Sequence, residues 1–241
     1  MPVKVAMVVS TKGYHWEEVF GAYEEFRRAG WEVGLYTVNG DKPKPDPSSL
    51  KRTGPLSIFG YGVSKRNSPD NPFGQELMHR FTSVKALSEL NTDKIEALYL
   101  PGGFGCMFDM NRNEQLHDLI MDLKKKEKVL SGVCHATSTF AFVNEGAGSI
   151  VRGKKITGFP KSLDLAAIGL GIVDPEFLPL PFSNEDTIKK EGADLKWYNR
   201  LIAALNPLYV RTDWPFVTGV GPKAARRVAK KIVRKVNRIN L

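Results

Sequence analysis

The sequence is poor in cysteine and contains no long apolar run. Its two cysteines, Cys106 and Cys134, are too few for the disulfide framework of a small secreted domain, which favours a reducing cytoplasm. No apolar segment approaches the roughly 20 residues that a membrane-spanning helix needs, and the N-terminus has no signal-peptide pattern. These absences predict a soluble, cytoplasmic protein without a membrane partner.

Two kinds of binding motif are also missing. The sequence has no glycine-rich phosphate loop followed by Lys-Ser/Thr, and no clustered spacing of metal ligands. His15, His79 and His117 are therefore interpreted as surface or structural residues, although His15 lies near a segment of interest below. We expect neither a metal nor another cofactor.

Acidic residues are absent from residues 223–241, which carry eight of the charges behind a formal net charge of +9. Ala224, Val228, Ile232 and Val236 recur every four residues in this segment and form one apolar stripe on a helix. Because no aromatic residue is interleaved with the bases, a terminal helix packed on the body is favoured over nucleic-acid or membrane binding. No nucleic-acid partner is predicted.

The hydrophobic content of 42% over 241 residues suits one large domain spanning residues 1–241. Apolar strands alternate with helices, which predicts an α/β fold with a doubly wound, mostly parallel sheet and helices on both faces, of flavodoxin-like type. An irregular excursion, rich in Pro, Gly, Ser and Asn, is expected at about 40–83. Strands are expected at 3–10, 31–38, 97–100, 128–131, 155–158 and 216–219, and helices at 18–29, 84–90, 113–126, 136–144, 184–191 and within 223–241.

Cys134 lies where the strand at 128–131 turns into the helix expected at 136–144. This position resembles a nucleophile elbow, and the positive end of a helix dipole should lower the pKa of the thiol. An unpaired cysteine is otherwise more often a small buried hydrophobe, and that reading is favoured for Cys106.

The sequence PGGFG at 101–105 follows a different strand of the same sheet. Backbone N–H groups near Gly102 and Gly103, together with the N–H of His135, are candidate donors to a substrate oxyanion, although a Gly-Gly pair is also common in a simple tight turn. Glu18 should reach the same edge from the first helix and hydrogen-bond the sulfur, or else only complement the helix dipole; Glu17 is the exposed alternative. His135 directly follows the nucleophile, so its ring is expected to swing away from the thiol.

Three of these segments together resemble the signature of the DJ-1/PfpI superfamily: GYHWEE at 13–18, LPGG at 100–103 and GVCHA at 132–136. DPSS at 46–49, the excursion after it and ITGF at 156–159 are similar to the heat-shock protein 31 and glyoxalase III branch. The pair Ala136-Thr137 and the segment at 220–222 depart from common family sequences, which puts the substrate in doubt.

The resemblance implies catalytic roles for Cys134, His135 and Glu18. It also implies a third acid that orients the histidine, for which Asp164 is the candidate. The implied activity is that of a cofactor-independent, glyoxalase III-type enzyme that converts methylglyoxal or a related 2-oxoaldehyde to a 2-hydroxy acid. The implied partners are a small-molecule aldehyde substrate and a second copy of the chain in a homodimer.

Two other functions remain open at this point. The same thiol could serve a cysteine hydrolase, namely a peptidase, amidase or deglycase, because a thiolate with an oxyanion hole supports both chemistries. The chain could instead be a holdase chaperone or stress-response protein with an apolar surface around Phe59, Tyr61 and Phe73. A low-pKa, exposed Cys134 would also suit a redox sensor.

Overall fold

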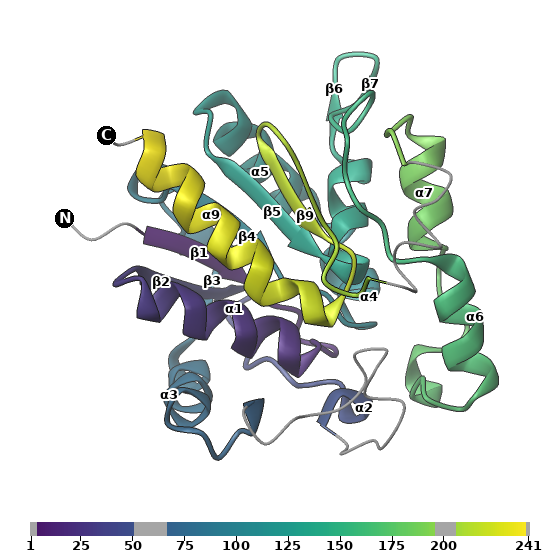
Figure 1. Cartoon of the computed structure of the whole chain (residues 1–241), viewed down its shortest axis with the longest axis horizontal. Helices are drawn as coiled ribbons and strands as arrows, with labels where there is room; N and C mark the ends of the chain where they lie inside the picture. Colours follow the sequence, from purple (N-terminus) through teal and green to yellow (C-terminus); the bar gives the residue numbers. More distant parts are fainter. Residues whose placement is uncertain (1–3, 51–66, 196–205, 240–241) are drawn as a thin grey trace.

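A seven-stranded sheet forms the centre of the computed structural model, which describes residues 4–50, 67–195 and 206–239 (Figure 1). The strand order is β3-β2-β1-β4-β5-β9-β8, and every neighbouring pair is parallel except β8 with β9. The strands are β1 (Lys4–Val8), β2 (Glu32–Thr37), β3 (Lys85–Ala86), β4 (Ala97–Leu100), β5 (Val129–Val133), β8 (Val210–Asp213) and β9 (Phe216–Gly219), and a separate hairpin pairs β6 (Asn144–Glu145) with β7 (Gly148–Ser149).

Both faces of the sheet are buried, because its central strands are apolar at consecutive positions. In and just after β1, Val5, Met7 and Val9 pack into the core on one face, whereas Ala6 and Val8 pack into the core on the other. Alternation of side chains along a strand sends neighbouring residues to opposite faces, so a continuous apolar run needs cover on both.

Helices α1 (Trp16–Arg28) and α9 (Ala225–Ile239) lie side by side over one face, and α5 (Glu114–Lys125) covers the other (Figure 1). The apolar stripe predicted on the basic C-terminal segment is buried against the first of these faces. This arrangement confirms the predicted doubly wound α/β fold. The other helices are α2 (Pro47–Leu50), α3 (Pro72–Arg80), α4 (Cys106–Asp109), α6 (Lys161–Gly169) and α7 (Asn184–Lys190), with short 3-10 segments η3 (Phe81–Ser83), η4 (Leu87–Glu89), η5 (Thr92–Lys94), η6 (Cys134–Phe142), η7 (Pro175–Phe177) and η8 (Pro222–Ala224).

Two of the predicted elements are wrong because of tertiary pairing. Residues 84–90 are not a helix, since Lys85–Ala86 pairs with β2 as strand β3 and only the 3-10 turn η4 follows. Residues 155–158 are not a strand, because β8 occupies that side of β9 as an antiparallel partner. The N–H of Thr157 instead donates to Oγ1 of Thr218 at 2.9 Å.

The helix predicted at 136–144 is a 3-10 helix, η6, that begins at Cys134 itself. This segment is rich in Ser and Thr, whose hydroxyl groups compete for backbone carbonyls. Thr137 Oγ1 donates to the carbonyl of Cys134 at 2.7 Å, and Ser138 Oγ donates to the carbonyl of His135 at 2.9 Å.

The excursion expected at about 40–83 is more ordered than predicted in its described parts, where it contains α2, α3 and η3. Helix α3 begins at a Pro and is capped by Asn71, whose side chain accepts from the N–H of Phe73 at 3.0 Å. Pro at the first helical position and Asn at the N-cap are favourable signals for the start of a helix. The high content of Pro, Gly, Ser and Asn in this segment had instead favoured irregular structure. Residues 51–66 lie outside the described residues.

Candidate active site

Cys134 follows the last residue of β5, at the carboxyl edge of the parallel sheet, and is buried with 3% of its surface exposed. Its φ angle of 55° is in the left-handed region. A residue with a Cβ avoids this region, at a cost on the order of 1–3 kcal/mol, unless its surroundings hold it there. The sharp turn directs the side chain out of the strand, as the nucleophile-elbow expectation required.

Glycine at position 102 lets Glu18 and Cys134 approach each other. A Cβ there would lie 2.8 Å from the carbonyl oxygen of Val133 and 3.0 Å from both the Cys134 Cβ and Glu18 Oε2. The N–H of Gly102 donates to Oε2 of the fully buried Glu18 at 2.6 Å, and the Glu18 carboxyl also interacts with the Cys134 thiol. Glu17, predicted as the exposed alternative, is partly buried and accepts a hydrogen bond from the Asn67 side chain.

Burial raises the pKa of Glu18 to about 7, against the opposing effects of the Gly102 hydrogen bond and the Cys134 contact. Burial also raises the pKa of the Cys134 thiol, and the neighbouring Glu18 charge adds to that effect. Two negative charges are therefore disfavoured here, and the Glu18–Cys134 pair keeps one proton at neutral pH.

The expectation that the start of a helix lowers the pKa of the Cys134 thiol is wrong in this structure. The sulfur is almost wholly removed from water, and removal from water disfavours the thiolate. The segment that begins at Cys134 is a 3-10 helix with poorer dipole alignment than an α-helix. Ionisation of the sulfur therefore depends on a neighbouring group that takes its proton.

His135 is one such neighbour, because its Nδ1 lies 3.3 Å from Cys134 Sγ. The expectation that the ring swings away from the thiol is wrong. Nε2 of the same ring lies 2.9 Å from Oδ1 of Asp164, in the first turn of α6, and both side chains are buried. The ring also packs between Phe104 and Phe159, at centroid distances of 4.9 and 4.6 Å. A carboxylate on Nε2–H leaves Nδ1 as a proton acceptor toward the sulfur.

The predicted oxyanion donors differ in whether their backbone N–H groups are already hydrogen-bonded within the protein. The N–H of Gly102 is already bonded to Glu18, so it positions that carboxyl and is not free for a substrate oxygen. Gly103 has a φ of 110° and lies against the backbone of Gly13 and His15, where a Cβ would approach within 2.5 Å. Gly103 and His135 both line the cavity at Cys134, which leaves their amides as the remaining candidates.

No local sequence pattern marks the residues that hold the Cys134–His135 turn. Nδ2 of Asn184 and Nδ2 of Asn111 both donate to the carbonyl of His135, at 2.9 and 3.0 Å. Oδ1 of Asn184 also accepts from the N–H of Phe159 at 2.7 Å. These two asparagines come from different parts of the chain, so only the fold brings them to the strained turn.

A small cavity opens beside the sulfur. It leaves about 10 Å³ for the centre of a water-sized sphere, roughly what one water molecule needs. His15, interpreted above as a surface or structural residue, is buried and lines this cavity. That interpretation rested on the absence of metal-ligand spacing, which does not indicate whether a histidine lines a cavity. The lining residues are His15, Asp46, Gly103, Phe104, Cys134, His135, Phe159 and Pro222.

Other residues singled out in the sequence lie away from this cavity. Cys106 is packed in the core, and its Sγ donates to the carbonyl of Gly103 at 3.1 Å. His117 Nε2 lies 2.9 Å from the carbonyl of Asn111. Phe73 packs against the core under Arg28 and is not part of an open apolar surface, whereas Phe59 and Tyr61 lie outside the described residues.

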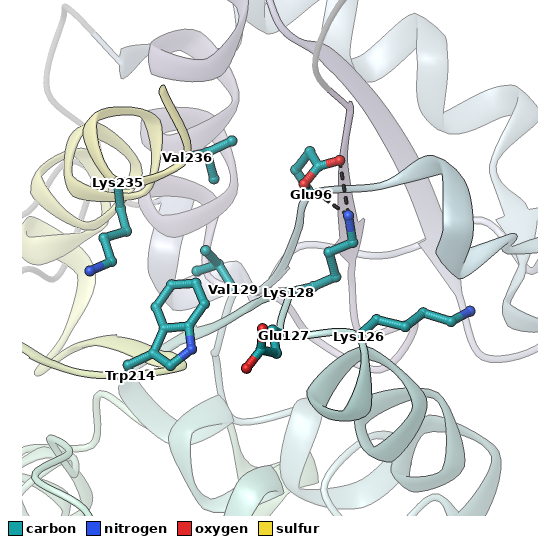
Figure 2. Close-up of a pocket in the computed structure, with 8 residues that line it drawn as sticks. All are labelled: Glu96, Lys126, Glu127, Lys128, Val129, Trp214, Lys235 and Val236. Atoms are coloured by element: carbon teal, nitrogen blue, oxygen red, sulfur yellow. Dashed lines mark hydrogen bonds and ion pairs between the residues drawn. The ribbon is translucent and has the colours of Figure 1, made fainter. Parts of the chain in front are cut away.

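A much larger cavity, of about 570 Å³ in the same measure, lies at the opposite end of the sheet, where β4 and β5 begin (Figure 2). Two of its lysines are already paired: Lys128 contacts both carboxylate oxygens of Glu96, at 2.9 and 3.0 Å, and Lys126 pairs with Asp93 and Asp122. Lys235 lies 5.0 Å from the centre of the Trp214 ring. No buried nucleophile is among its lining residues.

Within residues 4–50, 67–195 and 206–239 no group of three or more His, Cys, Asp or Glu side chains is arranged to hold a metal ion. Within the same residues no helix has both the length and the apolar character to cross a membrane.

Comparison with known proteins gives a consistent picture. The model of the DJ-1/PfpI family matches residues 3–235. The chain is 25% identical to the glutathione-independent glyoxalase hsp3101 of Schizosaccharomyces pombe, with 92% of this chain and 86% of the relative covered. It is 26% identical to the glutathione-independent glyoxalase HSP31 of Saccharomyces cerevisiae, with 90% and 86% covered. The crystal structure of glyoxalase III from Candida albicans superposes with a TM-score of 0.72 at 24% identity, with 96% of each chain covered.

Proposed function

Because this chain belongs to the DJ-1/PfpI family, we propose that it is a glutathione-independent glyoxalase that converts methylglyoxal or a related 2-oxoaldehyde to a 2-hydroxy acid. The relatives in the heat-shock protein 31 and glyoxalase III branch carry this activity in their names, which agrees with the sequence-based prediction of the branch.

The observation that carries the proposal is a connected set of proton-transfer groups around one sulfur. Cys134 is in contact with Glu18 on one side and with Nδ1 of His135 on the other, and Asp164 accepts from the far nitrogen of that ring. The cavity beside the sulfur is small, so a compact aldehyde needs far less displacement of the lining side chains than a peptide does.

In the proposed reaction, Cys134 Sγ attacks the aldehyde carbon C1, and its proton passes by way of Glu18 or His135 to the C1 oxygen, which becomes a hydroxyl. Glu18 suits this role because its pKa of about 7 matches a neutral working pH. His135, oriented by Asp164, then moves the C1 proton to C2 through an enediol, which leaves a thioester. Water hydrolyses the thioester and releases the 2-hydroxy acid. Amides of Gly103 and His135 are the proposed donors to the developing oxyanion.

The direct test measures lactate formed from methylglyoxal by the purified chain without glutathione. Cys134→Ala is the matched control, because it removes one sulfur atom from a buried position. We expect turnover that depends on Cys134. Equal rates in the two proteins, or no lactate from either, would rule the proposal out.

The other functional predictions are not favoured by a specific contact. A peptidase would need space for an extended chain, whereas the described cavity is near the size of one water molecule. The holdase prediction depended on an apolar surface of which only Phe73 is described, and Phe73 is packed. Protection of an aggregating client protein by both wild type and Cys134→Ala would support a holdase role.

We also propose a cytoplasmic homodimer. Both cysteines are unpaired in the described structure, which suits a reducing compartment. The dimer follows from the family resemblance, and a mass measurement in solution tests it.

A further inference from the structure

We propose that Asp46 is a second acid-base residue of this active site, which hydrogen-bonds the C2 oxygen of a 2-oxoaldehyde and gives it a proton. This inference rests on the glyoxalase proposal above and adds a residue and a substrate requirement to it. Asp46 opens the DPSS segment at 46–49 and directly precedes α2.

Asp46 lies in the cavity wall together with Cys134 and His135. One carboxylate oxygen, Oδ1, is fully used in local structure, where it accepts from the N–H of Ser48 at 2.8 Å and from Ser48 Oγ at 2.7 Å. The other oxygen, Oδ2, is buried and accepts no hydrogen bond from any described residue. The whole residue is 0% exposed. A buried oxygen of this kind is costly unless a ligand or a proton satisfies it.

The backbone holds Asp46 firmly against the segment that precedes α1. The N–H of Asp46 donates to the carbonyl of Tyr14 at 2.8 Å, and Ser49 Oγ donates to the carbonyl of Asp46 at 2.6 Å. Ser49 Oγ in turn accepts from the N–H of Trp16 at 3.1 Å. A group fixed in this way can contact a substrate without a large loss of side-chain entropy.

A cap for the following turn does not by itself require an acid. Ser or Asn would supply the Oδ1-type acceptor equally well. An aspartate differs from Ser or Asn in having a second carboxyl oxygen that can carry a proton. Burial raises the pKa of Asp46, so its protonated form is more populated than that of a surface aspartate. A protonated carboxyl can donate to a carbonyl oxygen that a carboxylate would repel.

The proton balance of the reaction needs such a group. When His135 removes the C1 proton, the electron pair forms the C1=C2 bond and the C2=O pair moves onto the C2 oxygen. Asp46 gives its proton to that oxygen. When the enediol collapses to the thioester, C2 takes the proton from His135 and the C1 hydroxyl loses its proton, which returns to Asp46. The residue therefore ends the step as it began, and no outside oxidant or reductant is required.

The test compares Asp46→Asn with Asp174→Asn, a matched change of acid to amide. Asp174 lies close enough to raise the Asp46 pKa but does not line the cavity. We expect Asp46→Asn to lower kcat for methylglyoxal by at least about 100-fold, the range of general acid catalysis, and Asp174→Asn to change it less than about threefold. Asp46→Ser, which keeps a cap acceptor for residue 48 but no acid, should behave as Asp46→Asn does, and thermal melts check that each variant is folded.

A second readout needs no turnover. Protection of Cys134 against iodoacetamide is measured with methylglyoxal and with propanal, which lacks the C2 oxygen. We expect the preference for methylglyoxal to fall about tenfold in Asp46→Ser, whose shorter side chain has no group in place of Oδ2, as the loss of one hydrogen bond predicts, and to stay unchanged in Asp174→Asn. Wild-type kcat together with wild-type preference in the Asp46 variants would overturn the inference while leaving the glyoxalase proposal intact. If the wild type itself makes no lactate, the glyoxalase proposal fails, and the preference alone decides whether Asp46 contacts the C2 oxygen.

Discussion

The two cavities at opposite ends of the sheet differ in how their polar groups are satisfied. The larger one, at the start of β4 and β5, includes the partly exposed ion pair of Lys128 with Glu96 (Figure 2). The smaller one, at the end of β5, holds a strained cysteine and a carboxylate oxygen without a partner among the described residues, and Glu18, with a pKa of about 7, contacts that cysteine. The size of a cavity is therefore a poor indicator of catalytic chemistry in this molecule. Buried polar groups without partners and groups with shifted pKa values indicate the reactive end of the sheet instead.

The largest contrast between the two ends should come from the nucleophile. Cys134→Ser keeps the shape of the turn but replaces the sulfur with a far less acidic hydroxyl. We expect its kcat/KM for methylglyoxal to fall by at least about 10³-fold, because loss of a nucleophile costs several kcal/mol of transition-state stabilisation. Lactate formation measures the effect, and activity within tenfold of wild type would place the chemistry elsewhere.

The orientation of His135 should give the next largest effect. Asp164→Asn keeps a hydrogen-bonding group near Nε2 but removes the carboxylate that favours a proton there. We expect kcat to fall about 100-fold or more while alkylation of Cys134 stays measurable. Replacement of the exposed Asp118 with Asn is a suitable control, because that residue lies on the outer surface of α5. Equal kcat values in the two variants would show that Asp164 has no orienting role.

The buried Glu18 should cost the protein stability at neutral and alkaline pH. Its folded-state pKa of about 7 lies above the ordinary 4.5, so its favourable contribution is present at pH 4 and is lost as the pH rises toward 7. Glu18→Gln removes this dependence. We expect the variant to gain on the order of 3 kcal/mol in unfolding free energy relative to wild type between pH 4 and pH 8, while it loses activity.

Urea denaturation at the two pH values tests the Glu18 prediction. Glu17→Gln is the matched control, since Glu17 precedes it on α1 but is only partly buried. A Glu18→Gln difference that does not change with pH would show that the carboxyl is not held in a costly buried state.

The smallest effect should come from the amino end of the sheet. Lys128→Ala breaks the Glu96 pair, whose side chains are 20% and 35% exposed. We expect a loss of about 1 kcal/mol or less in stability, reduced further by salt, and no change in methylglyoxal turnover. A tenfold loss of turnover in this variant would overturn the contrast between the two ends.

Local sequence was informative wherever one strand and the turn after it carried the signal. The apolar runs before PGG at 101–103 and before GVCHA at 132–136 both predicted strand ends at one sheet edge, and β4 and β5 end there. The structure also brings Glu18, predicted from its place at the start of the first helix, and Asp164, which the family resemblance supplied, to the two sides of the Cys134–His135 pair.

Features that depend on pairing between distant segments could not be predicted in this way. Strand β8 has a mixed pattern with little apolar periodicity, and only its antiparallel partner β9 defines it. Asn111 and Asn184 meet at the carbonyl of His135 from opposite sides, although nothing in their own neighbourhoods marks them. Burial of the Cys134 sulfur follows from the packing around it, so the dipole argument from local sequence predicted the wrong direction for its pKa.

The central claim is that Glu18 and Cys134 share one proton, and the pH profile of Cys134 alkylation tests it most directly. The rate of iodoacetamide labelling at Cys134 should rise with a midpoint near pH 7 in the wild type, where the pair first loses a proton. In Glu18→Gln no carboxylate takes the thiol proton as the sulfur reacts, so labelling should stay slow near pH 7 and rise only at higher pH, even though loss of the Glu18 charge lowers the pKa of the thiol. The same midpoint in both proteins would contradict the account.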